Sequence, residues 1–233
     1  MNKNLLLVAT ILFVLTGCSS VQKAMPEEQF KKSFPKNKYE SFGKTSVQGV
    51  YEVYNGSQVY YYLPEGDVII AGNMISRDGK NLTQESIDKR MVTRLAKLPL
   101  DSALKIGTGK TAIVEFIDPN CHYCRLSFNF FASRMKDVTL QVFFYPLSQD
   151  SVSKIRHIFC AQDKTRAYED VLSGKLDGSD KLNLCNNKDA EDMMKAHQEA
   201  SAKIGVRATP LFYIKGKVVP GFDQPAIEKL LIE

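Results

Sequence analysis

The chain has 233 residues, a formal net charge of +5 at pH 7, 44% hydrophobic residues, and 13 Phe and 10 Tyr but no Trp. The charge is mild and no dense Lys/Arg patch is interleaved with aromatic residues, so we expect no nucleic-acid partner. The length fits one or two domains. No apolar run reaches the roughly 20 residues that a membrane-spanning helix needs.

Residues 1–17 are typical of a secretory signal peptide. One lysine precedes an apolar run over residues 5–15, which is too short to span a bilayer. The run ends in LTGC at residues 15–18, which resembles the lipobox of bacterial lipoproteins and implies cleavage before Cys18 and lipid on its sulfur. Ordinary cleavage nearby would instead leave Cys18 as a free thiol. Ser19 follows the cysteine and favours the outer membrane over the inner membrane.

Residues 18–45 are rich in Lys, Ser, Pro and Glu, and we expect a tether with one short helix near residues 27–33. Three β-rich runs follow in residues 46–80, separated by turn signals at residues 55–56 and 65–66. Three short strands bury too little apolar surface to be stable alone. This N-terminal domain therefore needs a second domain or a second chain to pack on.

Residues 81–100 predict a linker helix that has Thr83 as its N-cap and ends before Pro99. Its apolar residues form a single stripe, made of Ile87, Met91, Leu95 and Leu98. From about Lys110 the chain alternates a strand, a helix, a strand, three helices, a β-hairpin at Gly216 and a last helix. This order predicts an α/β domain with a mixed sheet over residues 101–233.

Cys121 and Cys124 enclose His-Tyr at the junction between an apolar strand and a helix. Such a pair can be half of a zinc site, an inert disulfide, or a redox pair. A structural zinc site usually needs two such pairs, and His157 and His197 have no partner at ligand spacing, so we expect no metal. For redox chemistry, the helix N-terminus and His122 would favour a Cys121 thiolate, and the spacing places Cys124 within bonding reach.

Three further residues bear on this site. Glu115 lies in the strand before the cysteines, where burial would raise its pKa and let it accept the proton of Cys124; a solvent-facing position is the alternative. Cys160 lies on an apolar helix and is either a buried free cysteine or bonded to Cys185. In an oxidising compartment that disulfide would add about 3–4 kcal/mol of stability, so we expect a structural role for it.

Together these features resemble the bacterial periplasmic disulfide isomerases DsbC and DsbG, from about Val47 to Glu233. The specific points, in order, are the Cys-x-x-C after an apolar strand, IFCAQDK around Cys160, a later Cys185, Thr209-Pro210, and VVPGFDQP near the end. The resemblance implies an α+β protein of two domains: a thioredoxin-like catalytic domain and a small N-terminal dimerisation domain, joined by a linker helix. It also implies a V-shaped homodimer whose cleft holds unfolded protein.

The resemblance assigns roles to individual residues. It implies that Cys121 is the nucleophile, Cys124 the resolving cysteine, and Cys160–Cys185 the structural disulfide, with His122, Tyr123 and Thr209 beside the active site. Pro210 corresponds to the cis-proline of the family. The chain departs from the pattern in its lipobox, in His-Tyr where DsbC usually has Gly-Tyr, in Glu115 where DsbC has an apolar residue, and in its poorly matching N-terminal segment.

We therefore expect a thiol-disulfide isomerase/reductase, anchored by lipid in the periplasm, that rearranges wrong disulfides in exported proteins. It would need no cofactor, and a membrane electron donor of the DsbD type would keep its cysteines reduced. Two alternatives stay open. The first is a chaperone-like envelope assembly factor, in which the thiols matter little. The second is a monomeric, tethered thiol oxidase or reductase.

Overall fold

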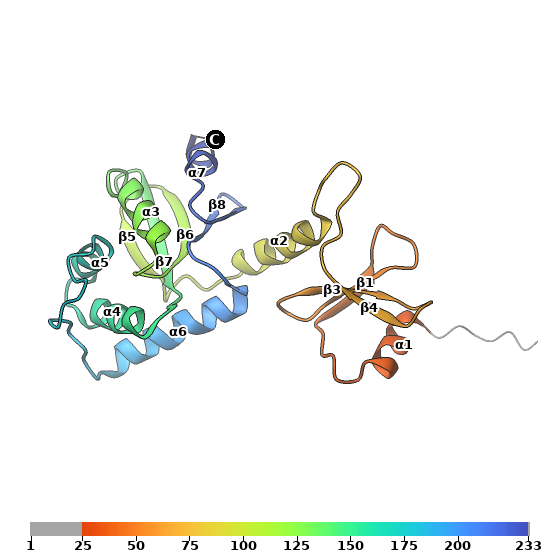
Figure 1. The fold of residues 1–233 in the computed structure, drawn as a ribbon. Coiled ribbons are helices and arrows are strands. Elements are labelled where there is room, and N and C mark those ends of the chain that lie inside the picture. The colour runs from red at the N-terminus through yellow and green to blue at the C-terminus, as the bar shows by residue number, and fades with distance from the viewer. Residues whose placement is uncertain (1–24, 233) are drawn as a thin grey trace, which may run out of the picture.

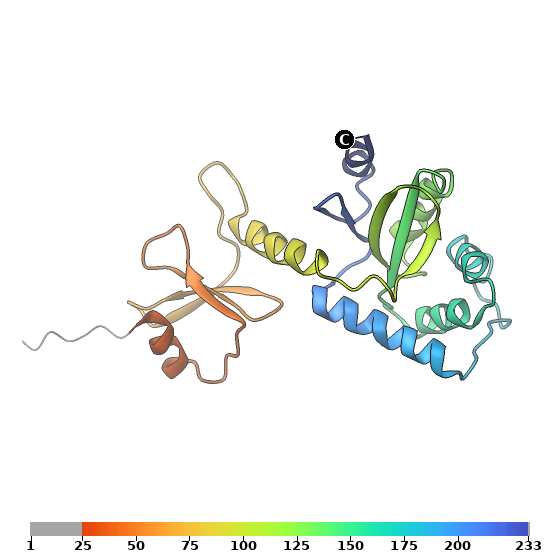
Figure 2. The same cartoon turned by 180° about the vertical axis from the view of Figure 1, so that it is seen from behind.

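The computed structural model describes residues 25–232 and has two folded units joined by a helix (Figure 1). The same arrangement seen from behind shows the N-terminal sheet separated from the larger unit, with α2 between them (Figure 2). This confirms the expected α+β class with two domains. Within residues 25–232, none of the helices combines the length and the apolar character that crossing a bilayer requires.

The N-terminal domain is an antiparallel sheet in the order β1-β2-β3-β4, covered on one face by a helix. Its elements are α1 (Pro26–Ser33), β1 (Ser41–Lys44), β2 (Tyr51–Tyr54), β3 (Val59–Leu63) and β4 (Val68–Ala71). Alternate residues of a strand point to opposite faces. Accordingly, Val53 and Tyr62 pack with Phe30 of α1, whereas Tyr54 and Tyr61 form a separate cluster on the other face.

The segment that we expected to be a tether differs from the prediction. Its short helix is present as α1, but β1 also lies in this segment and pairs with β2, so the sheet has four strands rather than three. The physical reason is aromatic burial. Phe30 is 1% exposed, and its ring centroid lies 5.2 Å from that of Tyr62 and 5.7 Å from that of Phe42. In the sequence, Phe30 and Phe42 are surrounded by Lys and Ser residues, so the pattern did not indicate that they pack in a core.

The linker helix α2 (Leu82–Leu95) bridges the two domains along its apolar stripe. Ile87 packs on the N-terminal domain, and Leu95 is buried in the core of the second domain. The N-cap prediction was wrong by two residues: the side chain of Asn81 accepts the hydrogen bond from Gln84 N at 3.0 Å. Thr83 is instead buried, with its hydroxyl bonded to the Tyr61 hydroxyl, so it joins α2 to β3.

The C-terminal domain is a five-stranded mixed sheet in the order β5-β7-β6-β8-β9, in which only β6 and β7 are parallel. Its elements are β5 (Leu104–Gly107), β6 (Thr111–Ile117), α3 (His122–Ala132), β7 (Val138–Phe144), α4 (Gln149–Cys160), α5 (Lys164–Leu172), α6 (Lys188–Ile204), β8 (Leu211–Ile214), β9 (Lys217–Pro220) and α7 (Gln224–Ile232). All the predicted elements are present. We did not predict β5, because four residues are too few to show a strand pattern.

The central strand β6 is buried on both faces. Ile113 and Ile117 lie in the core that includes residues of α3, α4, α5 and α7, whereas Val114 and Phe116 lie in the core that includes Leu95 of α2 and residues of α6. The period of two places Glu115 on the same face as Ile113 and Ile117, and therefore on the face that packs against α3.

The aromatic anchor of α1 gives a test of the N-terminal domain. We expect Phe30→Ala to destabilise this domain by about 3–5 kcal/mol, because it removes a fully buried ring from a small core. Val47→Ala, between β1 and β2, is the control, because Val47 is 47% exposed and its truncation should lower the stability much less. Urea unfolding followed by near-UV circular dichroism measures both. Equal losses in the two variants would contradict the assignment of Phe30 as the anchor.

Candidate active site

A tight turn connects β6 to α3 and carries the first cysteine. Asp118 is 1% exposed, and its carboxylate accepts hydrogen bonds from Asn120 N and Leu147 N, both at 2.7 Å. The carbonyl of Asp118 accepts a further bond from Cys121 N at 3.1 Å. Neither Asp118 nor Asn120 was among the residues predicted from the sequence, although Asp-Pro-Asn before a helix is a turn signal that indicates them. The turn fixes Cys121 as the N-cap residue of α3.

The two cysteines of the Cys-x-x-C pair are free and differ in exposure. Cys121 is half-buried, and no side-chain cap bonds the first N–H groups of α3, so these groups remain available at this position. Cys124 is 1% exposed, and burial raises the pKa of its thiol. The arrangement thus has one accessible sulfur and one protected sulfur a helical turn away.

Thr209 and Pro210 lie beside Cys121, although they are far from it in the sequence. The Thr209–Pro210 bond is cis, and Cys121 Sγ donates to the Thr209 carbonyl at 3.4 Å. His122 and Tyr123 are both exposed, Tyr123 by 59%. The structure therefore brings both cysteines and the cis-proline together and leaves the two intervening residues at the surface.

Glu115 is a buried carboxyl group in the centre of the sheet. It pairs with Val142 of β7 on one side and Phe212 of β8 on the other, and it is 1% exposed. The Tyr168 hydroxyl of α5 donates to Glu115 Oε1 at 3.1 Å. Burial raises the pKa of Glu115 to about 7, and this hydrogen bond offsets part of the effect. The solvent-facing alternative for Glu115 does not apply.

Cys160 and Cys185 form a disulfide bond that joins the end of α4 to the segment before α6. Their Cα atoms are 5.7 Å apart and 25 residues separate them in the sequence. Arg156 donates to the carbonyl of Cys185 at 3.0 Å and fixes the same segment. The disulfide therefore links α4 covalently to the segment between α5 and α6, as the sequence indicated.

In residues 25–232, no three His, Cys, Asp or Glu side chains gather in a way that could hold a metal ion. Both ring nitrogens of His197 have partners within the fold. Its Nδ1 accepts a hydrogen bond from Phe144 N at 2.9 Å, and its Nε2 lies 2.7 Å from the Ser102 carbonyl. Burial lowers the pKa of His197 to about 4. His157 likewise accepts a bond from Asn183 N at 2.8 Å. Cys18, the predicted lipidation site, lies outside the described residues.

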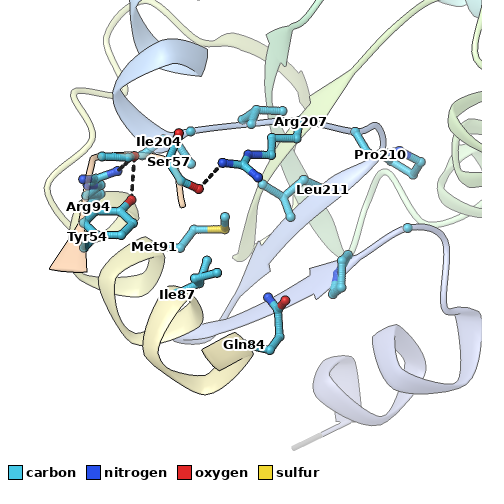
Figure 3. Close-up of a pocket in the computed structure, with 16 residues that line it drawn as sticks. Tyr54, Ser57, Gln84, Ile87, Met91, Arg94, Ile204, Arg207, Pro210 and Leu211 are labelled. Carbon is cyan, nitrogen blue, oxygen red and sulfur yellow. Dashed lines mark hydrogen bonds between the residues drawn. The ribbon is translucent and has the colours of Figure 1, made fainter. Parts of the chain in front are cut away.

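A pocket of about 200 Å³ lies where the two domains and α2 meet (Figure 3). Apolar residues of α2, such as Met91, face the segment that leads into Pro210. Arg94 donates to the Gly56 carbonyl at 3.2 Å, and Arg207 donates to the Ser57 carbonyl. The β2–β3 turn of the N-terminal domain is thereby held next to the segment that carries the cis-proline.

The raised pKa of Glu115 predicts a pH-dependent stability. Between about pH 4.5 and 7 the unfolded chain loses this proton while the folded chain keeps it, so the free energy of unfolding falls as the pH rises. The expected loss is about 3 kcal/mol. Glu115→Gln should remove this slope, and Glu169→Gln, an exposed position on α5, should not. Urea unfolding at pH 4.5 and 7.5 measures the difference, and parallel slopes for wild type and Glu115→Gln would contradict it.

Comparison with known proteins places this chain in a family. The model for the disulfide bond isomerase protein N-terminal domain matches residues 19–84, and the model for a thioredoxin-like domain matches residues 99–232. The probable thiol:disulfide interchange protein DsbC of Bordetella avium is 35% identical over 132 residues, which cover 54% of this chain and 47% of that protein. The chain thus spans about half the length of this relative. DsbC of Escherichia coli K12 is 26% identical over 225 residues, which cover 93% and 89% of the two chains.

Solved structures show the same fold. The thiol-disulfide exchange protein alpha-DsbA2 of Wolbachia pipientis matches with a TM-score of 0.52 and 16% identity over 66% of this chain and 98% of that chain. A linker-deletion variant of Proteus mirabilis ScsC matches with a TM-score of 0.51 and 19% identity over 64% and 84%. The chain belongs to the thioredoxin-like family, with a disulfide bond isomerase N-terminal domain in front of its thioredoxin-like domain.

Proposed function

We propose that this protein is a thiol-disulfide isomerase and reductase that acts on wrongly bonded exported proteins. The observation that carries the proposal is the asymmetric pair at the start of α3. Cys121 is accessible at a helix N-terminus, and Cys124 is buried one turn behind it. An accessible thiolate can attack a disulfide, and a protected thiol close to it can resolve the product.

The reaction begins when the Cys121 thiolate attacks one sulfur of a client disulfide. The client S–S bond breaks, a mixed disulfide forms, and the other client sulfur leaves as a thiolate. In isomerisation, a client thiolate then attacks its own mixed-disulfide sulfur and releases Cys121 unchanged. In reduction, Cys124 attacks Cys121, which leaves a Cys121–Cys124 disulfide and a client dithiol.

The reductive route requires Cys124 to lose its proton in a buried site. Glu115 lies on the face of β6 that packs against α3, and its raised pKa suits a group that accepts and returns a proton near neutral pH. We propose this role for it. The oxidised enzyme must then be re-reduced, and a membrane dithiol donor of the DsbD type would supply the two electrons and two protons.

The N-terminal domain supports a homodimer. Its four strands form a small sheet whose last strand, β4, has a free edge, and Val68 and Ile70 of that strand are 46% and 50% exposed. Matching to the N-terminal domain of disulfide bond isomerases supports the same conclusion. In such a dimer two catalytic domains would face a shared cleft, and sedimentation of the chain from Ser19 onward should give twice the monomer mass.

Cys121 is the first residue to test. The chain from Ser19 onward should recover a scrambled multi-disulfide protein in a glutathione buffer, and Cys121→Ser should reduce that recovery to the level of buffer alone. Cys124→Ala should accumulate mixed disulfides with the client, since release by the resolving thiol is removed. The recovered activity of the client and non-reducing electrophoresis measure the two effects.

Other outcomes would assign a different function. Full recovery by Cys121→Ser would contradict the proposed mechanism. Reduction of a simple disulfide without recovery of the scrambled client would indicate a tethered oxidase or reductase. Suppression of aggregation that survives loss of both Cys121 and Cys124 would indicate a chaperone-like assembly factor.

We also propose that lipid on Cys18 anchors the protein in the periplasm, at the outer membrane. The LTGC sequence and the following Ser19 support this location. In cells, Cys18→Ala should move the protein from the membrane fraction to the soluble fraction, because the thioether to lipid can no longer form. Separation of the two membranes on a density gradient checks the outer-membrane assignment. A variant that stays in the membrane fraction would contradict the anchor.

A further inference from the structure

Lys154 is a buried charged group that the proposed reaction does not use. It lies on α4 and its side chain is only 3% exposed. Burying an ammonium group is unfavourable unless it is paired and hydrogen-bonded. Its three N–H donors have three acceptors: Asn120 Oδ1 at 2.6 Å, Asp177 Oδ1 at 2.6 Å and Asp150 Oδ2 at 3.1 Å. The lysine is therefore fully engaged, and one of its partners is the residue before Cys121.

Asn120 connects this charge to the active-site turn. Its amide nitrogen donates to Asp150 Oδ2 at 2.8 Å and to Ser151 Oγ at 3.0 Å, both at the start of α4. Its amide oxygen accepts from Lys154 further along α4. Its main-chain N–H donates to the Asp118 carboxylate. The side chain thus ties the turn to one helix at several points.

A second link reaches the same turn from α3. Arg125 Nε donates to the Pro119 carbonyl at 2.9 Å, and the guanidinium binds Asp177 through two bonds of 2.5 and 2.7 Å. Asp177 follows α5 and is also bonded to Lys154. Both residues between Asp118 and Cys121 are therefore held by a network that spans α3, α4 and the segment after α5.

We infer that Lys154 is a positioning residue, which fixes Cys121 through Asn120 and so sets the reactivity of its thiolate. The N–H groups of α3 stabilise a thiolate only when the sulfur lies over them, and disulfide attack depends on the position of that sulfur. The inference rests on the proposed role of Cys121 as nucleophile. It adds a residue that controls the reactivity of Cys121 and that lies on α4 rather than in the Cys-x-x-C segment.

The test measures the thiol itself. In protein whose Cys121–Cys124 pair is reduced, peptide mass spectrometry reports the rate at which iodoacetamide modifies Cys121. Lys154→Met keeps the length of the side chain and removes its charge, and we expect about a tenfold slower reaction. Lys175→Met is the matched control, because Lys175 makes a 2.6 Å ion pair with Asp170 that does not reach the turn. Its rate should equal that of wild type.

A double-mutant cycle separates positioning from a general loss of stability. Asn120→Ala cuts the direct link from Lys154 to the turn. It leaves in place the ion pairs of Lys154 with Asp150 and Asp177 and the bond from Arg125 to the Pro119 carbonyl. It should slow the reaction of Cys121 as well, and adding Lys154→Met to it should cause little further change. Rates that multiply in the double variant, or an unchanged rate in Lys154→Met, would overturn the inference.

Two further results keep the test decisive. If Lys154→Met does not fold, a wild-type rate in Asn120→Ala alone would overturn the inference, and a slowed rate would support it. The rate of modification is independent of isomerase activity. A wild-type protein with a reactive Cys121 but no recovery of scrambled client would therefore contradict the proposed function while leaving the positioning role intact.

Discussion

The turn from β6 into α3 is the constraint on which the site depends. A central strand that is buried on both faces delivers the chain to Asp118, whose carboxylate is satisfied by two main-chain N–H groups. The register of the turn is fixed, because a shift of one residue would expose that carboxylate or leave it buried without hydrogen-bond donors. Cys121 consequently occupies the N-cap of α3, and Cys124 faces the core one turn later.

This geometry divides the chemistry between two otherwise equal thiols. Cys121 is half-buried at the N-terminus of α3, whereas Cys124 is buried, and burial disfavours its thiolate. The same burial acts on Glu115, which the alternation of β6 places on the α3 side of the sheet. Because Glu115 is buried, the free energy of unfolding falls as the pH rises from about 4.5 to 7. The Tyr168 hydroxyl supplies only one hydrogen bond to offset this cost. The core therefore retains a carboxyl group that adds little apolar packing, and we propose that it exchanges a proton with Cys124.

The N-terminal domain and the catalytic domain are connected by more than a flexible chain. The apolar stripe of α2 begins against the N-terminal sheet and ends in the core of the catalytic domain. Arg94 and Arg207 approach the β2–β3 turn from α2 and from the segment before the cis-proline. The N-terminal domain is thereby in direct contact with the segment that leads into Pro210.

The sequence by itself determined the elements around the Cys-x-x-C, because these depend on local periodicity. Cysteine arithmetic favoured a Cys160–Cys185 disulfide over a free Cys160, and the resemblance to DsbC and DsbG implied the two-domain class. The sequence also identified Glu115, since an acidic residue within an apolar run can be recognised from the sequence alone. It could not choose between a buried and an exposed Glu115, because that depends on which strands flank β6. The folding of the predicted tether into α1 and β1 could not be predicted for a similar reason. Phe30 stabilises this segment by packing on Tyr62, and that contact exists only in the folded domain.

Only the tertiary structure decided which charged residues hold the active-site turn. The family resemblance placed Thr209 beside the active site, and the structure brings its carbonyl, 88 residues away in the sequence, to 3.4 Å from the Cys121 sulfur. Lys154, Asp177 and Arg125 come from separate elements and carry no motif, and they appear in the sequence as ordinary surface charges. Their burial and pairing depend on how α4 and the segment after α5 pack against the active-site turn. Local pattern specifies the elements, whereas contacts of high sequence separation exist only after the chain has packed.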